Sequence, residues 1–148
     1  MAVAEWARQY VGRVFDEVTP CWGVVRAVYA EQYGLELPTY GTRCPNAADA
    51  AQVALLVTEE RWREQAWHAV PLGSEKPGDV LLLRARGFPA HVGVVVGDHR
   101  MLHCECEATT ACEDYHRLNW RRRIVGCYRH AALMAEGGSD GNAAGTAR

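Results

Sequence analysis

The sequence predicts an α+β fold, with N-terminal helices packed on one face of an antiparallel sheet. Helical spacing of apolar residues dominates the chain up to about residue 65, and strand-like segments between Gly and Pro turns follow from Trp67. Helices first and strands afterwards is the order of an α+β protein. The chain has 148 residues, 49% of them apolar and 23% charged, which suits one soluble domain around one core.

The helices are predicted from apolar residues that recur at helical spacing. Residues 2–12 are expected to form a short helix, and residues 21–33 a second helix whose apolar pairs are four positions apart. Gly34 then stands where a C-terminal glycine commonly ends a helix. A third helix is expected over residues 46–57, capped by its first residue, and the charged residues 58–65 are expected to be helical as well.

The strands are predicted from short apolar or alternating segments between turns. The expected strands are Ala66–Val70, Val80–Leu83, His91–Val96, Met101–Glu105 and Ile124–Tyr128. Pro77–Gly78 provides the turn before the second strand, and the third and fourth strands are expected to form a hairpin. All of these elements fall within residues 1–134, which we interpret as the domain. Residues 135–148 are rich in Ala, Gly, Ser, Asn and Thr and are expected to be a disordered tail.

Charge and composition exclude several classes of function. The formal net charge of −2 gives no indication of a nucleic-acid-binding surface, and no apolar run is long enough to span a membrane. The N-terminus carries Glu5 and Arg8 and lacks the apolar segment of a secretory signal, so synthesis in the cytosol is expected. Without a secretory signal, we expect most of the six cysteines to be reduced thiols.

Cys21 is the first candidate for chemistry because the second helix is expected to begin there. A thiol at that position faces unpaired backbone N–H groups and the positive end of the helix dipole, which favour the thiolate. The thiolate is the nucleophilic form of cysteine, and the same N–H groups could hold an oxyanion during attack. The alternative is that Cys21 is a small buried apolar residue, as many cysteines are.

His91 and His103 are informative as a pair. They are twelve positions apart across the predicted hairpin. If Gly97–His99 form a three-residue loop, Gly93 lies opposite His103, and the two histidines become diagonal neighbours on one face; a two-residue turn would separate them. A cysteine with a histidine base, oriented by a third polar residue, is the arrangement for acyl transfer through a thioester. The residues therefore indicate Cys21 as nucleophile, His91 as base and His103 as the orienting residue.

Six short segments, taken in order, add a resemblance to a known family. They are Cys21–Arg26 with Tyr29, Gly34–Tyr40, Pro77–Val80, His91–Gly93, Leu102–His103 and Arg122–Arg129. Together they resemble the NlpC-type cell-wall cysteine peptidases, and most closely the branch found in phage tails and gene transfer agents. The resemblance covers roughly residues 5–131. It implies a papain-like α+β fold and hydrolysis of the peptide stems of peptidoglycan, with the three catalytic roles given above.

The resemblance also implies substrate contacts, partners and a cellular setting. The backbone amides of Cys21 and Trp22 would hold the oxyanion, and Phe15 stands where the family often has a pocket tyrosine. Pro20 stands where the family often has an aspartate, which affects the choice of stem bond. No cofactor or metal is implied. The expected partners are peptide stems and other proteins of a phage-like tail, which would deliver the protein from the cytosol to the cell wall.

Two other functions stay open at this point. One is a structural protein of a tail tip that has the same fold and no longer hydrolyses anything. The other is a metal-binding structural domain, for which His103, Cys104, Cys106 and Cys112 offer ligands. However, this cysteine spacing is not a common zinc spacing, and Cys104 and Cys106 alternate with His103 along the strand.

Overall fold

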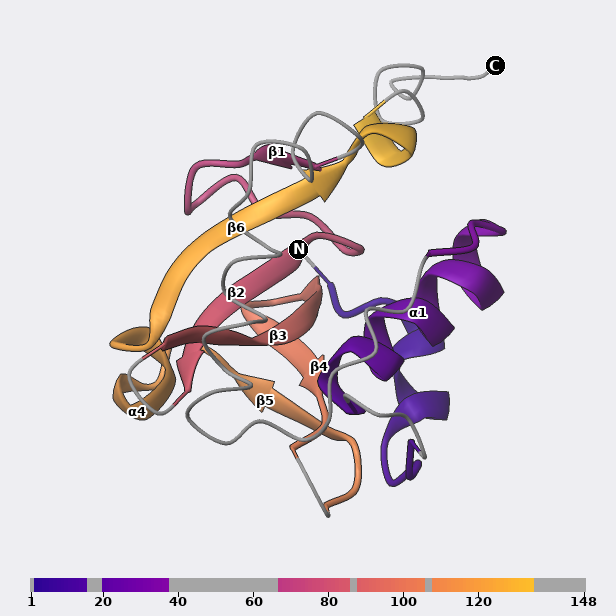
Figure 1. Ribbon diagram of the computed structural model, residues 1–148, viewed down its shortest axis with the longest axis horizontal. Coiled ribbons are helices and arrows are strands. Elements are labelled where there is room, and N and C mark those ends of the chain that lie inside the picture. The colour runs from indigo at the N-terminus through magenta and orange to yellow at the C-terminus, as the bar shows by residue number, and fades with distance from the viewer. Residues whose placement is uncertain (1, 16–19, 38–66, 86–87, 106–107, 135–148) are drawn as a thin grey trace.

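A six-stranded antiparallel sheet with helices against one face forms the centre of the fold (Figure 1). The computed structural model describes residues 2–15, 20–37, 67–85, 88–105 and 108–134. The predicted helices over 46–57 and 58–65 and the predicted tail lie outside these described residues, so they stay predictions. None of the helices among the described residues is long and apolar enough to cross a lipid bilayer.

The element order confirms the predicted α+β class. The elements are a 3-10 helix η1 (Glu5–Tyr10), α1 (Pro20–Tyr33), β1 (Trp67–Ala69), β2 (Val80–Ala85), β3 (Phe88–Gly97), β4 (Arg100–His103), β5 (Ala111–Asp114), α4 (Leu118–Arg121) and β6 (Ile124–His130). The strands follow the order β1-β6-β2-β3-β4-β5 across the sheet, and all neighbours are antiparallel. The five predicted strands are present, whereas β5 and α4 were not predicted.

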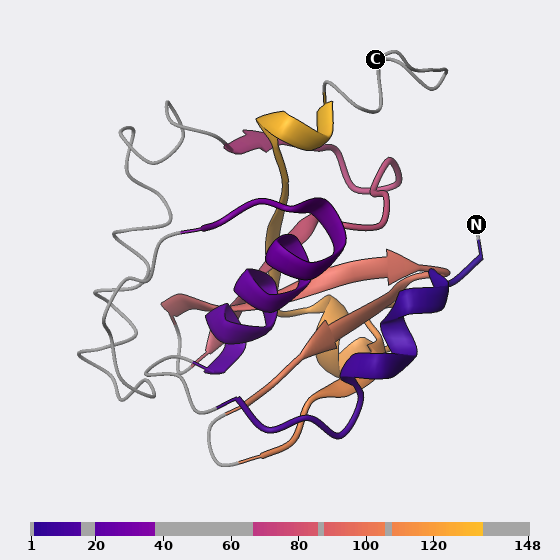
Figure 2. The same cartoon turned by 90° about the vertical axis from the view of Figure 1, so that its right-hand side faces the viewer.

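Helix α1 packs on one face of the sheet, mainly over β3 (Figure 2). It ends at Tyr33 because Gly34 adopts a left-handed φ of 65° and the Leu35 N–H bonds the Tyr29 carbonyl, as the sequence predicted. The buried apolar residues between helix and sheet include Val24, Val25, Val28, Tyr29, Val80, Leu82, Val92, Val94 and Val96. Alternate residues of β3 therefore face α1, and the residues between them face the opposite side.

The opposite face of the sheet is also buried, by a smaller cluster. Its members are Leu81, Leu83, Val95, Met101, Tyr115, Trp120 and Cys127. Trp120 comes from the short helix α4, so this four-residue helix closes the face on which His91 and His103 project.

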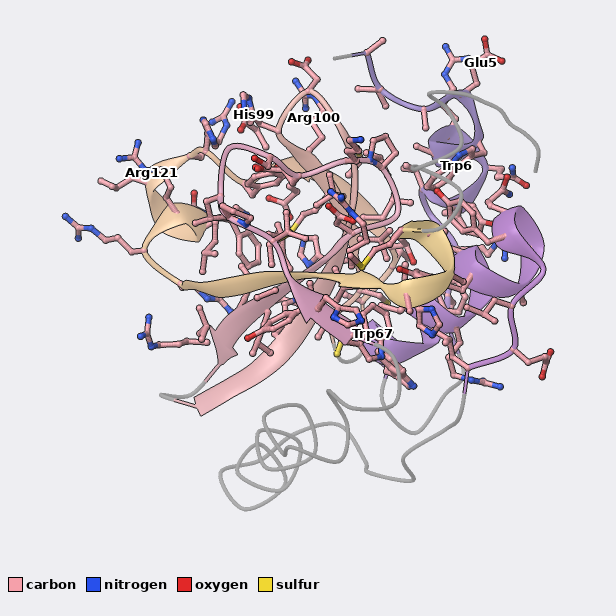
Figure 3. All side chains as sticks on the ribbon, turned by 90° about the horizontal axis from the view of Figure 1, so that it is seen from above. Glu5, Trp6, Trp67, His99, Arg100 and Arg121 are labelled. Carbon is pink, nitrogen blue, oxygen red and sulfur yellow. The ribbon has the colours of Figure 1, made fainter. Side chains whose placement is uncertain are left out.

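The β3–β4 hairpin has a different turn from the one predicted. Gly97 pairs with Arg100, and Asp98 and His99 have φ of 53° and 56°, so the turn has two residues and not three. His99 and Arg100 project from it at the edge of the molecule (Figure 3). A register shift between Val95 and Gly97 inserts one extra residue in β3. This bulge restores the predicted register, and the two histidines share a face despite the shorter turn.

A buried ion pair fixes the start of β2 to β6. Asp79 is fully buried, and Arg129 donates to both of its carboxylate oxygens at 2.8 Å. The Lys76 N–H also donates to Asp79, at 2.8 Å. The carboxylate beside Arg129 raises the pKa of the guanidinium above its usual value. Because β2 pairs with β3, this contact supports the strand that carries His91.

Removal of one partner of this pair is expected to destabilise the fold strongly. Arg129→Ala would leave the Asp79 carboxylate buried without its counter-ion, so the free energy of unfolding should fall by about 3–5 kcal/mol. Urea unfolding followed by circular dichroism measures the change. Arg100→Ala is the matched control, because its contact to Asp98 is exposed and 4.0 Å long, and it should cost about 1 kcal/mol or less. Equal losses of stability in the two variants would contradict the assignment of Asp79 and Arg129 as a buried, stabilising ion pair.

Candidate active site

Cys21 is the second residue of α1, and its thiol is buried rather than accessible. Only 4% of the residue is exposed, and burial raises the pKa of the thiol to about 11. The backbone N–H groups of Val92, Trp22 and Cys21 itself face the sulfur and act in the opposite direction. The predicted preference for the thiolate is therefore wrong for this structure, because the cost of burying a charge exceeds the contribution of the helix start.

The Val92 N–H faces Cys21 because strand β4 ends early. In the register of β3 and β4, Val94 pairs with Leu102, so Cys104 would stand opposite Val92. Strand β4 ends at His103, one residue before that position. The Val92 N–H therefore faces the Cys21 sulfur instead of a residue of β4. The thiol consequently lies beside the peptide bond that joins His91 to Val92.

His91 projects from β3 on the face opposite α1 and is held between aromatic rings. It is 6% exposed, its ring stacks on Trp120 with centroids 6.2 Å apart, and it meets the His103 ring edge-on at 5.2 Å. Burial lowers the pKa of His91 to about 3, and the charges of His103 and Arg123 act in the same direction. The imidazole is therefore neutral at pH 7, which is the form that can accept a proton.

A series of hydrogen bonds runs from His91 across three strands. His91 Nε2 lies 3.1 Å from His103 Nδ1, and His103 Nε2 lies 2.8 Å from Glu113 Oε2. The other Glu113 oxygen, Oε1, accepts a bond of 3.0 Å from Trp120 Nε1. Burial raises the pKa of Glu113, but the bonds from Trp120 and His103 outweigh it and bring the pKa below its usual value. Glu113 is therefore a carboxylate at neutral pH.

The carboxylate determines where the protons of this series lie. A carboxylate only accepts hydrogen bonds, so His103 Nε2 carries a hydrogen and donates it to Glu113. When His103 carries a single hydrogen, its Nδ1 atom then has the lone pair, and it accepts a bond from the Nε2–H of His91. This leaves His91 Nδ1 with a lone pair. Nδ1 is thus the atom of His91 that can take a proton from a thiol.

Cys21 and His91 are neighbours through the peptide bond between them and Val92, and not through a direct bond. Within the described residues, no hydrogen bond joins the Cys21 sulfur to the His91 ring. The His91 ring projects on the face of β3 opposite α1, so the thiol and the imidazole do not face each other in this structure. The structure brings His91 and His103 together as the sequence predicted. The catalytic roles of Cys21, His91 and His103 stay predictions.

The two residues predicted to contact substrate lie in different surroundings. The Trp22 backbone N–H faces the Cys21 sulfur, while its ring is buried and lies 6.3 Å from the ring of Trp67. Phe15 is half-buried against the main core, with the Arg13 guanidinium 5.8 Å from its ring. Residues 16–19, which join Phe15 to α1, lie outside the described residues. The role of Phe15 in substrate binding stays a prediction.

The alternative of a metal site around His103 finds no converging ligands in the described residues. Cys104 belongs to the core under α1, and its sulfur donates to the carbonyls of Glu105 and Ala108, whereas His103 points to the opposite face. Cys106 lies outside the described residues. A different set of potential ligands, Glu75, His99 and His116, spans up to 4.8 Å between ligand atoms. Tetrahedral zinc needs about 3.4 Å, so this set would have to contract.

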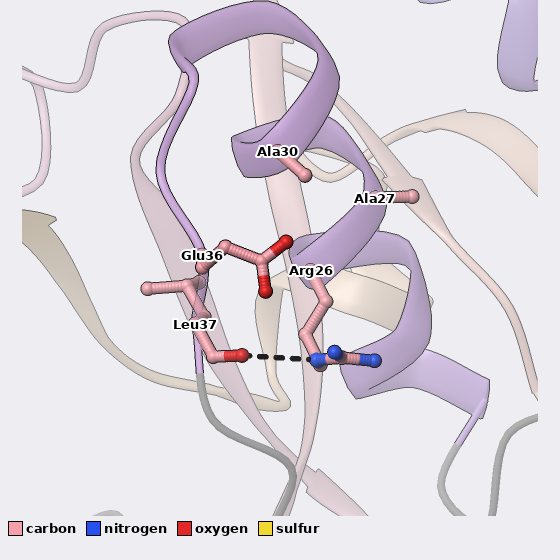
Figure 4. Close-up of a pocket in the computed structure, with 5 residues that line it drawn as sticks. All are labelled: Arg26, Ala27, Ala30, Glu36 and Leu37. Atoms are coloured by element: carbon pink, nitrogen blue, oxygen red, sulfur yellow. Dashed lines mark hydrogen bonds between the residues drawn. The ribbon is translucent and has the colours of Figure 1, made fainter.

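A separate pocket lies on the outer side of α1 (Figure 4). It is lined by Arg26, Ala27, Ala30, Glu36 and Leu37, and the Arg26 Nε donates to the Leu37 carbonyl at 3.1 Å. This pocket contains neither the thiol nor the histidine pair, so it is not the candidate active site.

Glu113 and Trp120 are the site residues that sequence reasoning missed. Glu113 pairs with Met101 in the β4–β5 ladder, while His103 pairs with Ala111. Glu113 and His103 are therefore diagonal neighbours on one face, in the same relation that His91 and His103 have on the previous pair of strands. A strand after the hairpin, with an acidic residue in this register, would have been the signal.

A cysteine at the start of a helix and a histidine pair on the antiparallel sheet under that helix are the arrangement expected of the papain-like fold. The profile of the NlpC/P60 family matches residues 9–129, and the chain belongs to this family. It is similar to the Murein DD-endopeptidase MepS/Murein LD-carboxypeptidase of Escherichia coli K12, with 23% identity over 124 residues, 81% of this chain and 55% of that protein. The chain thus spans about half the length of this curated relative.

Two solved structures share the fold. An NLP/P60-family protein of Staphylococcus aureus Mu50, described as similar to a lipoprotein, has a TM-score of 0.51 at 20% identity over 83% of this chain and 38% of its own. NlpC1 of Trichomonas vaginalis has a TM-score of 0.55 at 13% identity over 83% of this chain and 41% of its own. At these identities the likeness concerns the fold, and it agrees with the predicted papain-like α+β class.

Proposed function

We propose that the protein hydrolyses peptide stems of peptidoglycan through a thioester on Cys21. The observation that carries this proposal is the series from Glu113 through His103, which leaves a proton-accepting nitrogen on His91, the residue before the Val92 N–H that faces the Cys21 sulfur. Membership of the NlpC/P60 family and the similarity to a murein endopeptidase support the choice of substrate.

The reaction begins with a neutral thiol and a neutral imidazole. At pH 7 the thiol, with a pKa of about 11, keeps its proton, and His91, with a pKa of about 3, has none to give. For this reaction the His91 ring has to turn toward the thiol when substrate binds, and proton transfer from Cys21 to His91 Nδ1 then accompanies the attack of sulfur on the peptide carbonyl. The imidazolium then returns its proton to the leaving amine, and water, activated by His91, hydrolyses the thioester.

Backbone N–H groups at the start of α1 stabilise the oxyanion. The Cys21 and Trp22 amides already face the sulfur, so a carbonyl attacked by that sulfur would place its oxygen near them. In such a site, loss of one donor typically costs about 10²- to 10³-fold in rate.

The proposed setting is a phage-like tail that carries the protein from the cytosol to the cell wall. The resemblance of the six segments to tail-associated family members supports this part, including the segment that forms β6. Mass spectrometry of purified particles and of cell fractions tests it. Detection in particles would support the setting, and detection only as a free enzyme would overturn it.

The activity is tested by incubating the protein with purified peptidoglycan and identifying the products by mass spectrometry. We expect new free amino and carboxyl ends within the stem peptides, and their positions would give the bond that is cut. An unchanged muropeptide pattern would favour the alternative, a structural tail protein with the same fold.

A further inference from the structure

The two carboxylate oxygens of Glu113 contact two different side chains of the candidate site. One of its oxygens bonds His103 and the other bonds Trp120, so both oxygens have a fixed direction. The Trp120 indole N–H can only donate. Whatever atom replaces Glu113 Oε1 must therefore accept a hydrogen bond, and the orientation of the whole group is set by Trp120.

We propose that Glu113, oriented by Trp120, is a positioning residue that sets the tautomers of His103 and His91 and so keeps His91 Nδ1 able to accept the Cys21 proton. This inference rests on the proposed function for its kinetic consequence only. The placement of the protons follows from the three hydrogen bonds together with a singly protonated His103 ring, and it can be measured without any substrate.

Glu113→Gln shows the consequence because the change is nearly isosteric. Trp120 would hold the glutamine oxygen on its own side, and the amide NH₂ would then face His103 Nε2. His103 could accept that bond only if its hydrogen moved to Nδ1, where it would point at His91 Nε2. His91 would in turn carry its hydrogen on Nδ1. The nitrogen that should accept the thiol proton would be blocked.

The first test is nitrogen NMR of the histidine rings in the full chain. We expect the wild type to have His103 and His91 with hydrogen on Nε2, and Glu113→Gln to have both with hydrogen on Nδ1. Single His→Gln variants assign the signals. Wild-type His103 with hydrogen on Nδ1, or unchanged tautomers in Glu113→Gln, would overturn the inference, whatever the protein hydrolyses.

The second test is a double-mutant cycle on stem-peptide cleavage. Glu113→Gln alone should lower kcat by about 10²- to 10³-fold, less than the roughly 10⁴-fold for an amide placed directly on a catalytic histidine. Trp120→Phe removes the fixed donor, so the glutamine in the double variant can rotate and present its oxygen to His103. In the Trp120→Phe background, Glu113→Gln should therefore cost less than about 10-fold. Equal costs in both backgrounds would overturn the inference.

Glu75→Gln is the matched control for this cycle. Glu75, like Glu113, is a carboxylate that accepts two hydrogen bonds, from Gly73 and Tyr115, but it is more deeply buried and lies outside the site. The same chemical change there should leave kcat and both histidine tautomers unchanged. A loss of kcat as large as that in Glu113→Gln would mean that the effect arises from general destabilisation, and the positioning role would be rejected. If the wild type cleaves no peptidoglycan, the proposed function fails while the NMR test still decides the tautomers.

Discussion

Replacement of Cys21 by alanine is expected to abolish peptidoglycan cleavage while the protein stays folded. The variant lacks the only atom at this position that can form the acyl-enzyme, and the remaining groups cannot replace it. The rate should fall by about 10⁴-fold or more. The change removes one sulfur from a buried helix start, where alanine is well tolerated, so the free energy of unfolding should fall by only about 1–2 kcal/mol. Muropeptide analysis gives the first quantity, and urea unfolding gives the second.

Cys127→Ala is the matched control for this variant. Cys127 is also a buried free thiol, 2% exposed, but it lies on β6 in the cluster under Trp120. Its replacement should cost a similar amount of stability and leave cleavage intact. Cleavage by Cys21→Ala at the wild-type rate would show that the nucleophile lies elsewhere, and equal loss in both variants would point to a shared effect on folding.

The parts of the fold that the sequence predicts are those with local causes. Helix α1 was predicted because its apolar residues recur at helical spacing and Gly34 ends it, and both causes act within one segment. The same is true of the glycine-valine strand β3. Strand β5 has the sequence Ala-Cys-Glu-Asp and is half-buried throughout, so it shows no apolar alternation. It is a strand because β4 offers it a pairing partner, which is a non-local cause.

The same distinction between local and non-local causes applies to the residues of the candidate site. The pairing of His91 with His103 was predicted from hairpin register, although by a three-residue loop, and the structure reaches that register through a shorter turn and a bulge. The direction of the Cys21 pKa could not be predicted, because burial depends on how α1 packs on β3. Glu113 could not be predicted because its contact with His103 depends on strand β5, and β5 forms only through its pairing with β4.

His91→Ala is expected to be nearly as severe as Cys21→Ala at neutral pH, and His103→Ala milder. Without His91 the thiol has no proton acceptor, and a thiol with a pKa of about 11 supplies only about one thiolate in 10⁴ at pH 7. Loss of His103 removes orientation but leaves the accepting nitrogen, so its cost should be about 10- to 10²-fold. Initial rates of stem-peptide cleavage measure this order, with circular dichroism as the folding control.

The pH dependence distinguishes a lost base from a damaged fold. In His91→Ala the residual rate should follow the thiolate fraction, which rises about tenfold per pH unit as pH increases toward the thiol pKa of about 11. In the wild type the base is neutral His91, whose pKa of about 3 keeps it available from weakly acidic pH upward, so the rate should change little between pH 6 and 8. The ratio of wild-type to variant rate should therefore shrink about 10²-fold over that range. A ratio that stays constant with pH would mean that His91 does not accept the thiol proton, because a structural defect alone would lower the rate equally at each pH.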